Sequence, residues 1–548
     1  MSLVSLPPLL RSEPALGGLL GHPDGVVACP EPARPILLAA LSRLSGRRPL
    51  VVACLTGSMA GQTYDDLCQF LPEGEVVLFP AWETLPFERV SPSVETMGRR
   101  LEILWRLRNP DRAPAIVVAG VRALLQHLGP EANEIEPIVV RPEAVLDPDE
   151  LLTALVHQGY RREEMVEHRG EVARRGAIID VFPSTADAPI RIDLWGDTVD
   201  RLTTFGVNDQ RSVADLEEAL IFPARELIPS EAVRERAAKL VGAEPWGREQ
   251  WERLAEGALF DGMESWLPWL TDRDQLLTDV LGDNAKVVLI EPRRMRDRAA
   301  DLLAEEDDLA RTLASTWGRD PDVPFPRLHA DTDRLLGATN VQTWSIVPTP
   351  EGPDSPHLAA SGWGPLSADG GDGLAQRITA LLSDRWRVVV AADGEGSASR
   401  LEELLRERGL DFVRATAKTD LTKPGGYVTI APLHRGASIP SAGLALIAEA
   451  DLTGRRRTHR QPRARKRESA GFFEDLKPGN YVVHYMHGVG KYDGMVKRTI
   501  GGVERDYLLL SYKGNDKLYI PSDQIDTVRH YVGGEAPTLH RLGASPPT

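Results

Sequence analysis

One stretch of the chain approaches the spacing of a phosphate-binding loop. Residues 56–63 read Thr-Gly-Ser-Met-Ala-Gly-Gln-Thr and follow an apolar, strand-like run at 50–55. A working loop needs Gly-x4-Gly-Lys-Ser/Thr, because backbone N–H groups cradle the phosphates and the lysine neutralises them. Thr56 replaces the first glycine and Gln62 replaces the lysine. We therefore interpret the stretch as a strand–turn–helix connection, and we expect no nucleotide cofactor in this chain.

The cysteine and histidine residues form no recognisable metal-binding or catalytic pattern. Cys29, Cys54 and Cys68 lack the paired spacing of a zinc site, so we expect reduced thiols. His157 and His168 have no second ligand at metal spacing. No set of nucleophile, base and orienting residue is recognisable either. We predict no catalytic residue and no metal site.

Length and charge limit the remaining possibilities. A chain of 548 residues is too long for one core, so several domains are expected. A net charge of −16 disfavours broad binding to phosphate backbones. Residues 455–467 are the exception, with eight Lys or Arg and no acid, and we interpret them as a solvated linker, with weak nucleic-acid contact left open. No apolar run is long enough for a membrane span and no signal peptide is recognisable, so we expect a cytoplasmic location.

The elements that position these residues change character along the chain. Up to residue 141, apolar strands alternate with amphipathic helices, which predicts a parallel sheet. Residues 142–225 instead show strands with alternating polar and apolar residues, which predicts an inserted α+β domain with an antiparallel sheet. The predicted strands are 50–55, 76–79 and 115–119 in the first part, and 177–182, 190–195 and 199–205 in the insertion; the predicted helices are 35–44, 94–107 and 149–158.

Helical texture returns over 226–347, with one further strand at 286–290, and a Pro-, Gly- and Ser-rich boundary follows at 348–373. A second, smaller α/β domain is predicted over 374–452, and a basic linker over 453–472. Residues 473–535 carry short strands separated by glycine turns, which predicts a small β-barrel of the Tudor or SH3 type.

One strand of the insertion has the composition of a binding surface. Side chains alternate along a strand, so Ile190, Ile192 and Leu194 should point inward, and Arg191, Asp193 and Trp195 towards solvent. A tryptophan beside an arginine on an open sheet face is typical of an interface hot spot. The same composition would also arise if the tryptophan packed under a loop and the arginine formed an ordinary ion pair.

Residues 165–205, with ARRGAIIDVFP followed by RIDLWGDTVD, resemble the domain by which the transcription-repair coupling factors and UvrB recruit UvrA. The resemblance implies a UvrA-binding site at Arg175, Arg191 and Trp195. The family often has phenylalanine at the position of Trp195, so the aromatic character is kept.

Residues 80–107 (PAWETLPFERVSPSVETMGRRLEILWRL) resemble a signature of the same family and, more loosely, the first domain of UvrB. That alignment places the phosphate loop at 28–37 (ACPEPARPIL), which has neither glycine nor lysine. The resemblance implies a degenerate helicase-type α/β module with an inactive nucleotide site. It also implies that ATP and Mg²⁺ act in a downstream motor, which this chain lacks.

The segment LKPGNYVVHYMHGVGKY (476–492) and the later block KLYIP (517–521) resemble the RNA-polymerase-interacting domain of the coupling factors and the related CarD-type domain. The resemblance implies that an edge strand pairs with the polymerase β subunit. The implied contact residues are Val496, Lys497, Arg498, Thr499 and Ile500, together with Tyr519, which departs from the arginine of the CarD type.

We therefore expect a multidomain α/β protein: a UvrB-like module with an inserted domain, a second α/β domain and a C-terminal barrel. The expected function is docking in transcription-coupled excision repair, with UvrA and polymerase as partners and damaged or upstream DNA contacted mainly through the motor. Two alternatives are a nucleotide-dependent helicase subunit that uses residues 56–63, and a CarD-like transcription regulator with a long N-terminal extension.

Overall fold

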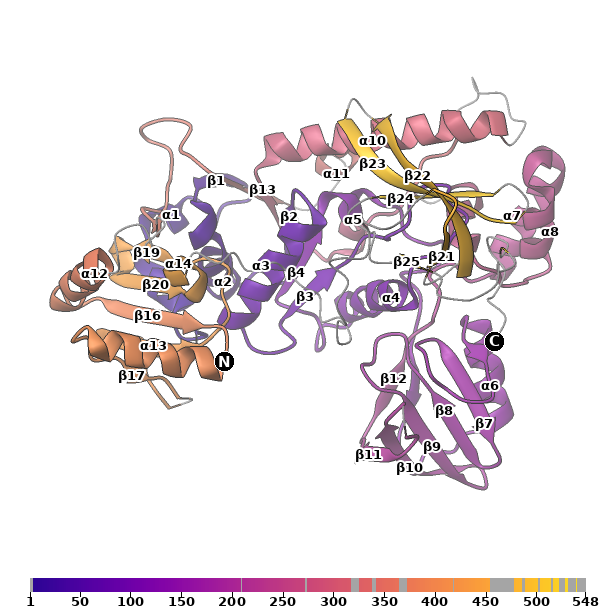
Figure 1. Ribbon diagram of the computed structural model, residues 1–548, viewed down its shortest axis with the longest axis horizontal. Helices are drawn as coiled ribbons and strands as arrows, with labels where there is room; N and C mark the ends of the chain where they lie inside the picture. The colour runs from indigo at the N-terminus through magenta and orange to yellow at the C-terminus, as the bar shows by residue number, and fades with distance from the viewer. Residues whose placement is uncertain are drawn as a thin grey trace.

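The structure is a computed structural model that describes residues 3–207, 209–271, 274–316, 325–337, 342–363, 372–416, 418–453, 478–484, 488–500, 503–513, 516–521, 528–530 and 539. It is a mixed α/β protein with several separate sheets, arranged along an elongated body (Figure 1). Of the basic linker expected at 453–472, only residue 453 lies within the described residues. No described helix combines the length and the apolar character needed to cross a membrane.

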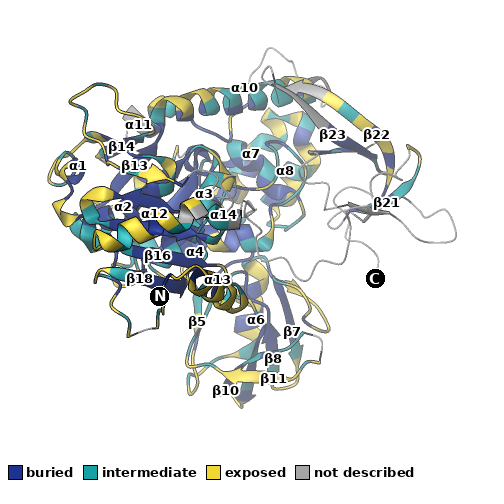
Figure 2. Cartoon of the chain, turned by 60° about the vertical axis from the view of Figure 1, so that its left-hand side comes forward, coloured by how far each residue is buried: buried dark blue, intermediate teal, exposed yellow. Residues whose placement is uncertain are grey.

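The first sheet is parallel and six-stranded, with the order β1-β14-β13-β2-β4-β3. Its central strands are buried on both faces, so they read as continuous apolar runs, as parallel strands between helical layers do. Figure 2 shows these strands in dark blue between helices with exposed outer faces. The strands are β1 (Gly25–Ala28), β2 (Leu50–Cys54), β3 (Val76–Phe79), β4 (Ile116–Gly120), β13 (Lys286–Ile290) and β14 (Thr343–Val347).

Two apolar clusters cover the two faces of this sheet. Val52 and Cys54 face a cluster that includes helices α2 and α3, whereas Val51 and Ala53 face a cluster that includes α4, α5 and α10. The helices are α2 (Arg34–Leu44), α3 (Gly57–Phe70), α4 (Val94–Arg108), α5 (Val121–Leu125) and α10 (Pro292–Thr316).

The inserted sheet has the order β11-β10-β9-β8-β7-β6, and its pairs are antiparallel except β6 with β7. Helix α6 (Pro148–His157) packs through Leu155 against the face that carries Ile179 and Ile192. Gly176 and Gly196 take positive φ values of 64° and 67° in the two tight hairpin turns, a conformation that favours glycine. The strands are β6 (Arg161–Arg162), β7 (Glu171–Arg175), β8 (Ile178–Val181), β9 (Ile190–Trp195), β10 (Thr198–Phe205) and β11 (Ser212–Asp215), and a separate pair joins β5 (Ile138–Val140) to β12 (Ala219–Ile221).

A helical unit follows the insertion around a cluster of aromatic rings. Trp251 and Trp266 meet edge to face with ring centroids 4.9 Å apart, and both are buried. Each buried aromatic ring removes a large apolar area from water. The cluster therefore holds this unit against the segment that contains Trp82 and Phe87. Its helices are α7 (Glu231–Ala243), α8 (Arg248–Ala255) and α9 (Leu267–Leu270), and α11 (Thr332–Gly337) comes later in the chain.

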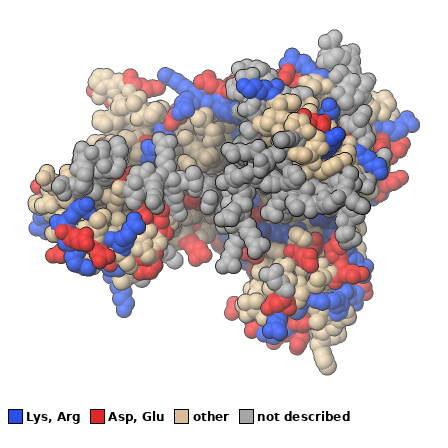
Figure 3. Space-filling model, in the orientation of Figure 1, with Lys and Arg blue, Asp and Glu red and all other residues tan. Residues whose placement is uncertain are grey.

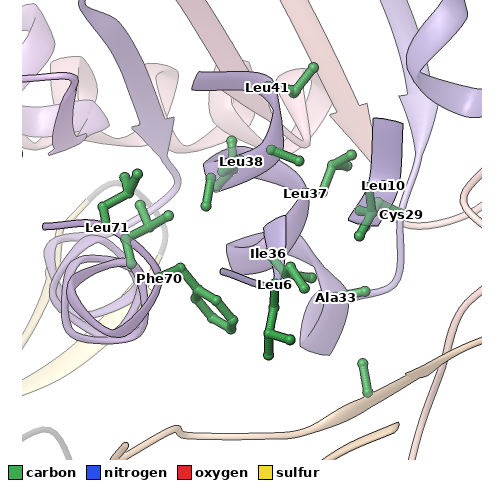
Figure 4. Close-up of a cluster of buried hydrophobic side chains, with 14 of the residues drawn as sticks. Leu6, Leu10, Cys29, Ala33, Ile36, Leu37, Leu38, Leu41, Phe70 and Leu71 are labelled. Carbon is green, nitrogen blue, oxygen red and sulfur yellow. The ribbon is translucent and has the colours of Figure 1, made fainter. Parts of the chain in front are cut away.

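The middle sheet has the order β15-β19-β20-β16-β18-β17 and shares one apolar core with the first sheet. Tyr427 and Leu446 of this sheet belong to the same cluster as Leu37 and Phe70 of the first module. Figure 4 shows part of that cluster around Ile36, Leu37 and Leu38 of α2. The elements are β15 (Ser361–Gly362), α12 (Asp372–Ser383), β16 (Arg387–Ala392), α13 (Glu395–Glu407), β17 (Val413–Arg414), β18 (Gly425–Ile430), β19 (Ala437–Ile439), β20 (Leu444–Ala448) and α14 (Glu449–Thr453).

The C-terminal sheet is antiparallel, with the order β24-β23-β22-β21-β25, and its core includes Val482, Tyr492 and Leu510. The expected barrel is not demonstrated, because no pairing among the described residues joins β24 to β25. The strands are β21 (Tyr481–His484), β22 (Gly488–Ile500), β23 (Val503–Ser511), β24 (Lys517–Pro521) and β25 (Val528–His530).

Candidate docking surfaces and nucleotide site

The outer face of the inserted sheet carries the three residues predicted to bind UvrA. Along β9, Ile190, Ile192 and Leu194 are buried, as the alternation predicted. Trp195 is 83% exposed, which excludes packing under a loop. An indole left in water on a rigid strand is a large apolar surface that a partner can bury.

Cross-strand pairing arranges this face in rows, because directly opposite residues of antiparallel strands point to the same side. One row, the inner row, contains Ala173, Asp180, Arg191 and Thr203. The next, the middle row, contains Arg175, Ile178, Asp193 and Arg201, and Trp195 lies opposite Thr198 in the row beyond.

Arg191 is held inside the protein's own structure. Its side chain is 13% exposed, and its Nε and Nη2 donate to Asp180 Oδ1 and Oδ2 at 2.7 and 2.9 Å. Its Nη1 donates to the Gln210 carbonyl at 3.0 Å, and its guanidinium lies 4.7 Å from the Phe205 ring centroid. The hydrogen bonds to Asp180 raise the pKa of Arg191 above its ordinary value. This corrects the expectation that Arg191 points to solvent: a loop and Phe205 cover the inner row.

Arg175 is more accessible but shares the same carboxylate. Its side chain is 47% exposed, and its Nη2 donates to Asp180 Oδ2 at 2.6 Å. One buried acid thus holds two arginines, which leaves a net positive charge and fixes the position of Arg175. The sequence analysis missed Asp180, although an acid within the apolar run of β8, between two strands that carry arginine, was the available signal.

The polymerase-facing prediction falls on the second half of β22. β21 pairs with this strand only as far as Lys491, whereas β23 pairs with it from Lys491 to Ile500. Gly479 and Asn480 extend this pairing to Tyr492 through two backbone hydrogen bonds. Beyond Tyr492, β23 is the strand neighbour of β22 within the described part of the chain, and helix α10 also contacts β22. Val496 is half-buried and Lys497 is exposed; for residues 498–500 the structure describes the backbone pairing alone.

Tyr519 is not brought to this edge. It lies on β24 opposite Leu509, and Leu509 lies opposite Gly494 of β22. β23 therefore separates Tyr519 from the predicted contact strand. A partner strand added beside residues 496–500 would not meet Tyr519 along the same edge.

At the carboxyl ends of the first sheet, the edge at which α/β proteins bind nucleotides, two buried side chains of opposite charge are paired. Arg34 follows β1 and Glu291 follows β13, and Arg34 Nη2 donates to Glu291 Oε1 at 2.8 Å with both side chains buried. Arg294 donates to the other oxygen of Glu291 at 2.7 Å. Burial would raise the pKa of Glu291, but the hydrogen bonds from Arg294 and Arg34 outweigh it and hold that pKa below its usual value.

The sequence that imitates a phosphate loop is also engaged internally. The Thr56 hydroxyl accepts the Met59 N–H at 3.1 Å and so caps helix α3. A Cβ added at Gly120 would lie 3.0 Å from Gly57 N, so the adjoining strand end leaves little room at this helix start. Among the described residues, no group of three or more His, Cys, Asp or Glu could hold a metal ion.

The signature segment at 80–107 acts inside the molecule. Arg100 and Glu226 are completely buried and paired at 2.7 Å, and the Trp82 indole N–H donates to the same carboxylate at 2.8 Å. A Cβ at Gly98 would lie 2.3 Å from the Ser184 hydroxyl, so only glycine fits against the inserted domain there. The segment joins the first sheet, the insertion and the helical unit, a role that the sequence analysis did not predict.

Three family models match separate parts of the chain. The UvrB interaction domain matches residues 138–227, the MFD D3 domain matches 383–452 and the CarD-like/TRCF RID domain matches 476–532. The first match includes Arg175, Arg191 and Trp195, and the last includes the second half of β22 and Tyr519.

Curated relatives match almost the whole chain. The transcription-repair-coupling factor of Mycobacterium tuberculosis is 35% identical over 96% of this chain and 46% of its own length. Those of Bacillus subtilis and Myxococcus xanthus are 30% and 31% identical, over 94% and 92% of this chain and 46% of their own length. The chain thus spans about half the length of the curated relatives it matches.

Proposed function

Since this chain is homologous over almost its whole length to the amino-terminal portion of the transcription-repair-coupling factors, we propose that it docks two partners in transcription-coupled excision repair. One partner is UvrA, at the outer face of the inserted sheet. The other is RNA polymerase, through its β subunit, at β22. The observation that carries the proposal is Trp195, 83% exposed on the same sheet face as Arg175 within the matched UvrB interaction domain.

On the UvrA side, Trp195 supplies apolar area and Arg175 supplies a positioned charge. Asp180 holds the Arg175 guanidinium in place before the partner arrives, so less side-chain entropy is lost on binding. Arg191 contributes by sharing Asp180 and by packing on Phe205, not by touching the partner.

On the polymerase side, the second half of β22 is suited to strand addition, in which main-chain hydrogen bonds provide affinity. Along a strand, the backbone N–H and C=O groups of successive residues point to alternate edges, and this alternation decides which residues can bond an added strand. The Tyr512 N–H donates to the Asp516 carbonyl, so the backbone of Tyr512 faces β24. Tyr507 lies an odd number of residues earlier, so its backbone faces β22. Its partner Val496 therefore faces β23, and the backbone of Thr499 faces the opposite edge.

We further propose that this chain neither hydrolyses ATP nor moves along DNA. The Arg34–Glu291 pair at the carboxyl ends of β1 and β13 supports this proposal, because each side chain neutralises the other and neither is free to hold a phosphate or a metal ion. ATP, Mg²⁺ and the main contacts to damaged or upstream DNA are assigned to the motor of the longer relatives. ATP turnover by the purified chain above a no-protein control would contradict this assignment.

Co-elution in size-exclusion chromatography tests the two-partner proposal. The chain is mixed with purified UvrA, with the polymerase β subunit, and with both. We expect two binary complexes and one ternary complex, because the two surfaces lie on different sheets. If the polymerase β subunit co-elutes with the chain but UvrA does not at micromolar concentrations, a transcription regulator with a CarD-like domain becomes the better account.

A further inference from the structure

The tight hairpin that presents Trp195 has a further neighbour from outside the sheet. The segment between β5 and α6 runs beside the start of β10: Glu143 N–H donates to the Val199 carbonyl at 2.8 Å, and Leu146 N–H to the Asp197 carbonyl at 2.6 Å. Val199 N–H returns a bond to the Ala144 carbonyl at 2.9 Å. Three backbone hydrogen bonds thus hold this segment in register with β10.

This register places Val145 in the same row as Trp195. Val145 forms a bridge with Thr198, and Thr198 lies opposite Trp195. Directly opposite residues share a face and lie about 5 Å apart, so the two apolar side chains flank Thr198 on the outer face. We call Trp195, Thr198 and Val145 the tip row.

Exposure of the outer face increases towards the tip row. Arg191 in the inner row is 13% exposed and Arg175 in the middle row is 47% exposed, whereas Val145 and Trp195 reach 76% and 83%. A single exposed valine is ordinary, but a valine and a tryptophan on the two sides of Thr198 place two exposed apolar side chains in one row of a hydrogen-bonded backbone.

The charges around this surface indicate the chemistry of its partner. Arg175 lies in the adjacent middle row, with its guanidinium on the carboxylate that Arg191 also uses, while Asp193 lies in that same row and Asp197 in the turn next to Trp195, so charges of both signs surround the tip row. A partner with an apolar pocket and polar groups of both signs at its rim is complementary to that arrangement.

We propose that Val145 is a second apolar anchor of the UvrA-docking surface, buried together with Trp195 when UvrA binds. This inference rests on the proposed function and adds a residue that lies outside the β9–β10 hairpin. Hot-spot side chains cluster in a centre from which water is excluded. A charge placed at Val145 should therefore weaken UvrA binding, and so should truncation of Trp195.

Titration of purified UvrA against the full chain and four variants, one of them Trp195→Ala, tests the inference. Val145→Asp should weaken binding at least tenfold. Val213→Asp is the matched control, because Val213 is a similarly exposed valine, 74%, on β11 at the other end of β10. It should change the affinity less than twofold. Val145→Leu should retain wild-type affinity, and circular dichroism should show equal folding of all variants.

The outcomes separate the inference from the function. Wild-type affinity in both Val145→Asp and Val213→Asp, with binding lost in Trp195→Ala, would overturn the role of Val145 and leave UvrA docking intact. Equal losses in both aspartate variants would also overturn it, since added charge anywhere on the domain would then suffice. No UvrA binding by the wild-type chain would overturn the docking function itself, and the inference with it.

Discussion

At the scale of single residues, buried carboxylates determine which charged groups remain for partners. Asp180 takes up Arg191 and positions Arg175, and Glu291 takes up Arg34. A buried ion pair contributes little net stability relative to apolar replacements, but loss of one partner leaves an uncompensated charge. Substitutions at these acids therefore act on folding before they act on docking.

Replacement of Asp180 should destabilise the inserted domain. Asp180→Asn removes the charge that both arginines share, and Arg191, 13% exposed, would keep a poorly solvated guanidinium. We expect a loss of about 3 kcal/mol in the free energy of unfolding, measured by urea denaturation. Asp215→Asn, whose carboxylate pairs with Arg201 at the exposed edge strand, is the control and should leave the denaturation midpoint unchanged. Equal midpoints for both variants would refute the organising role of Asp180.

Glu291 should make stability depend on pH. Its pKa in the folded protein lies below the usual 4.5, so its ionised form is favoured by folding. The stabilisation is present above the unfolded pKa and is lost as pH falls through the folded pKa. The stability difference between wild type and Glu291→Gln should therefore be constant near neutral pH and shrink below about pH 4.5. If thermal melts show the same stability difference between wild type and Glu291→Gln at every pH, the charge of Glu291 does not contribute to stability.

At the scale of elements, period and turn chemistry made most strands predictable. The continuous apolar runs of β2 and β4 are typical of parallel strands buried on both faces, and the alternation in β9 is typical of an antiparallel strand with one solvent-facing side. Both sheet types could therefore be predicted from the sequence. Tertiary relations did not follow. The sequence could not show that Arg191 would be covered by Phe205, or that β23 would lie between Tyr519 and residues 496–500, because both depend on segments remote along the chain.

Proline substitutions in β22 should separate its two edges. Val496→Pro removes an N–H that faces β23 and should disrupt the sheet, whereas Thr499→Pro removes one that faces the other edge. We expect Thr499→Pro to keep the β-sheet circular dichroism signal and lose binding to the polymerase β subunit in titration. Wild-type affinity in a folded Thr499→Pro variant would exclude strand addition at this edge.

At the scale of the whole molecule, recognition depends on local surfaces. Figure 3 shows Lys and Arg intermixed with Asp and Glu on the inserted and middle sheets, in a chain whose net charge is −16. On this face, the described residues of these two sheets form no large field of one sign that would attract nucleic acid. The first module and the middle sheet are held together by a shared apolar core and by buried polar contacts, among them Asp66 with His434.

Asp66 should fasten the middle sheet to the first module. Its Oδ1 accepts the backbone N–H of His434 at 2.9 Å and lies 3.0 Å from Nδ1, with both side chains largely buried. Asp66→Ala leaves a buried N–H without its acceptor, which should cost about 1–3 kcal/mol. Hydrogen exchange should speed up in residues 431–448, with Asp384→Ala, an exposed site on the middle module, as the control. Unchanged exchange would mean that the shared apolar core alone holds the two modules.

The most direct test of the account is calorimetric titration of UvrA against the wild-type chain and Trp195→Ala. The account predicts micromolar or tighter binding by the wild type and a loss of more than about 2 kcal/mol in the variant, because the exposed indole is the anchor of the surface. Equal affinities would show that UvrA binds elsewhere, and would contradict the claim that this sheet face is the repair-facing surface.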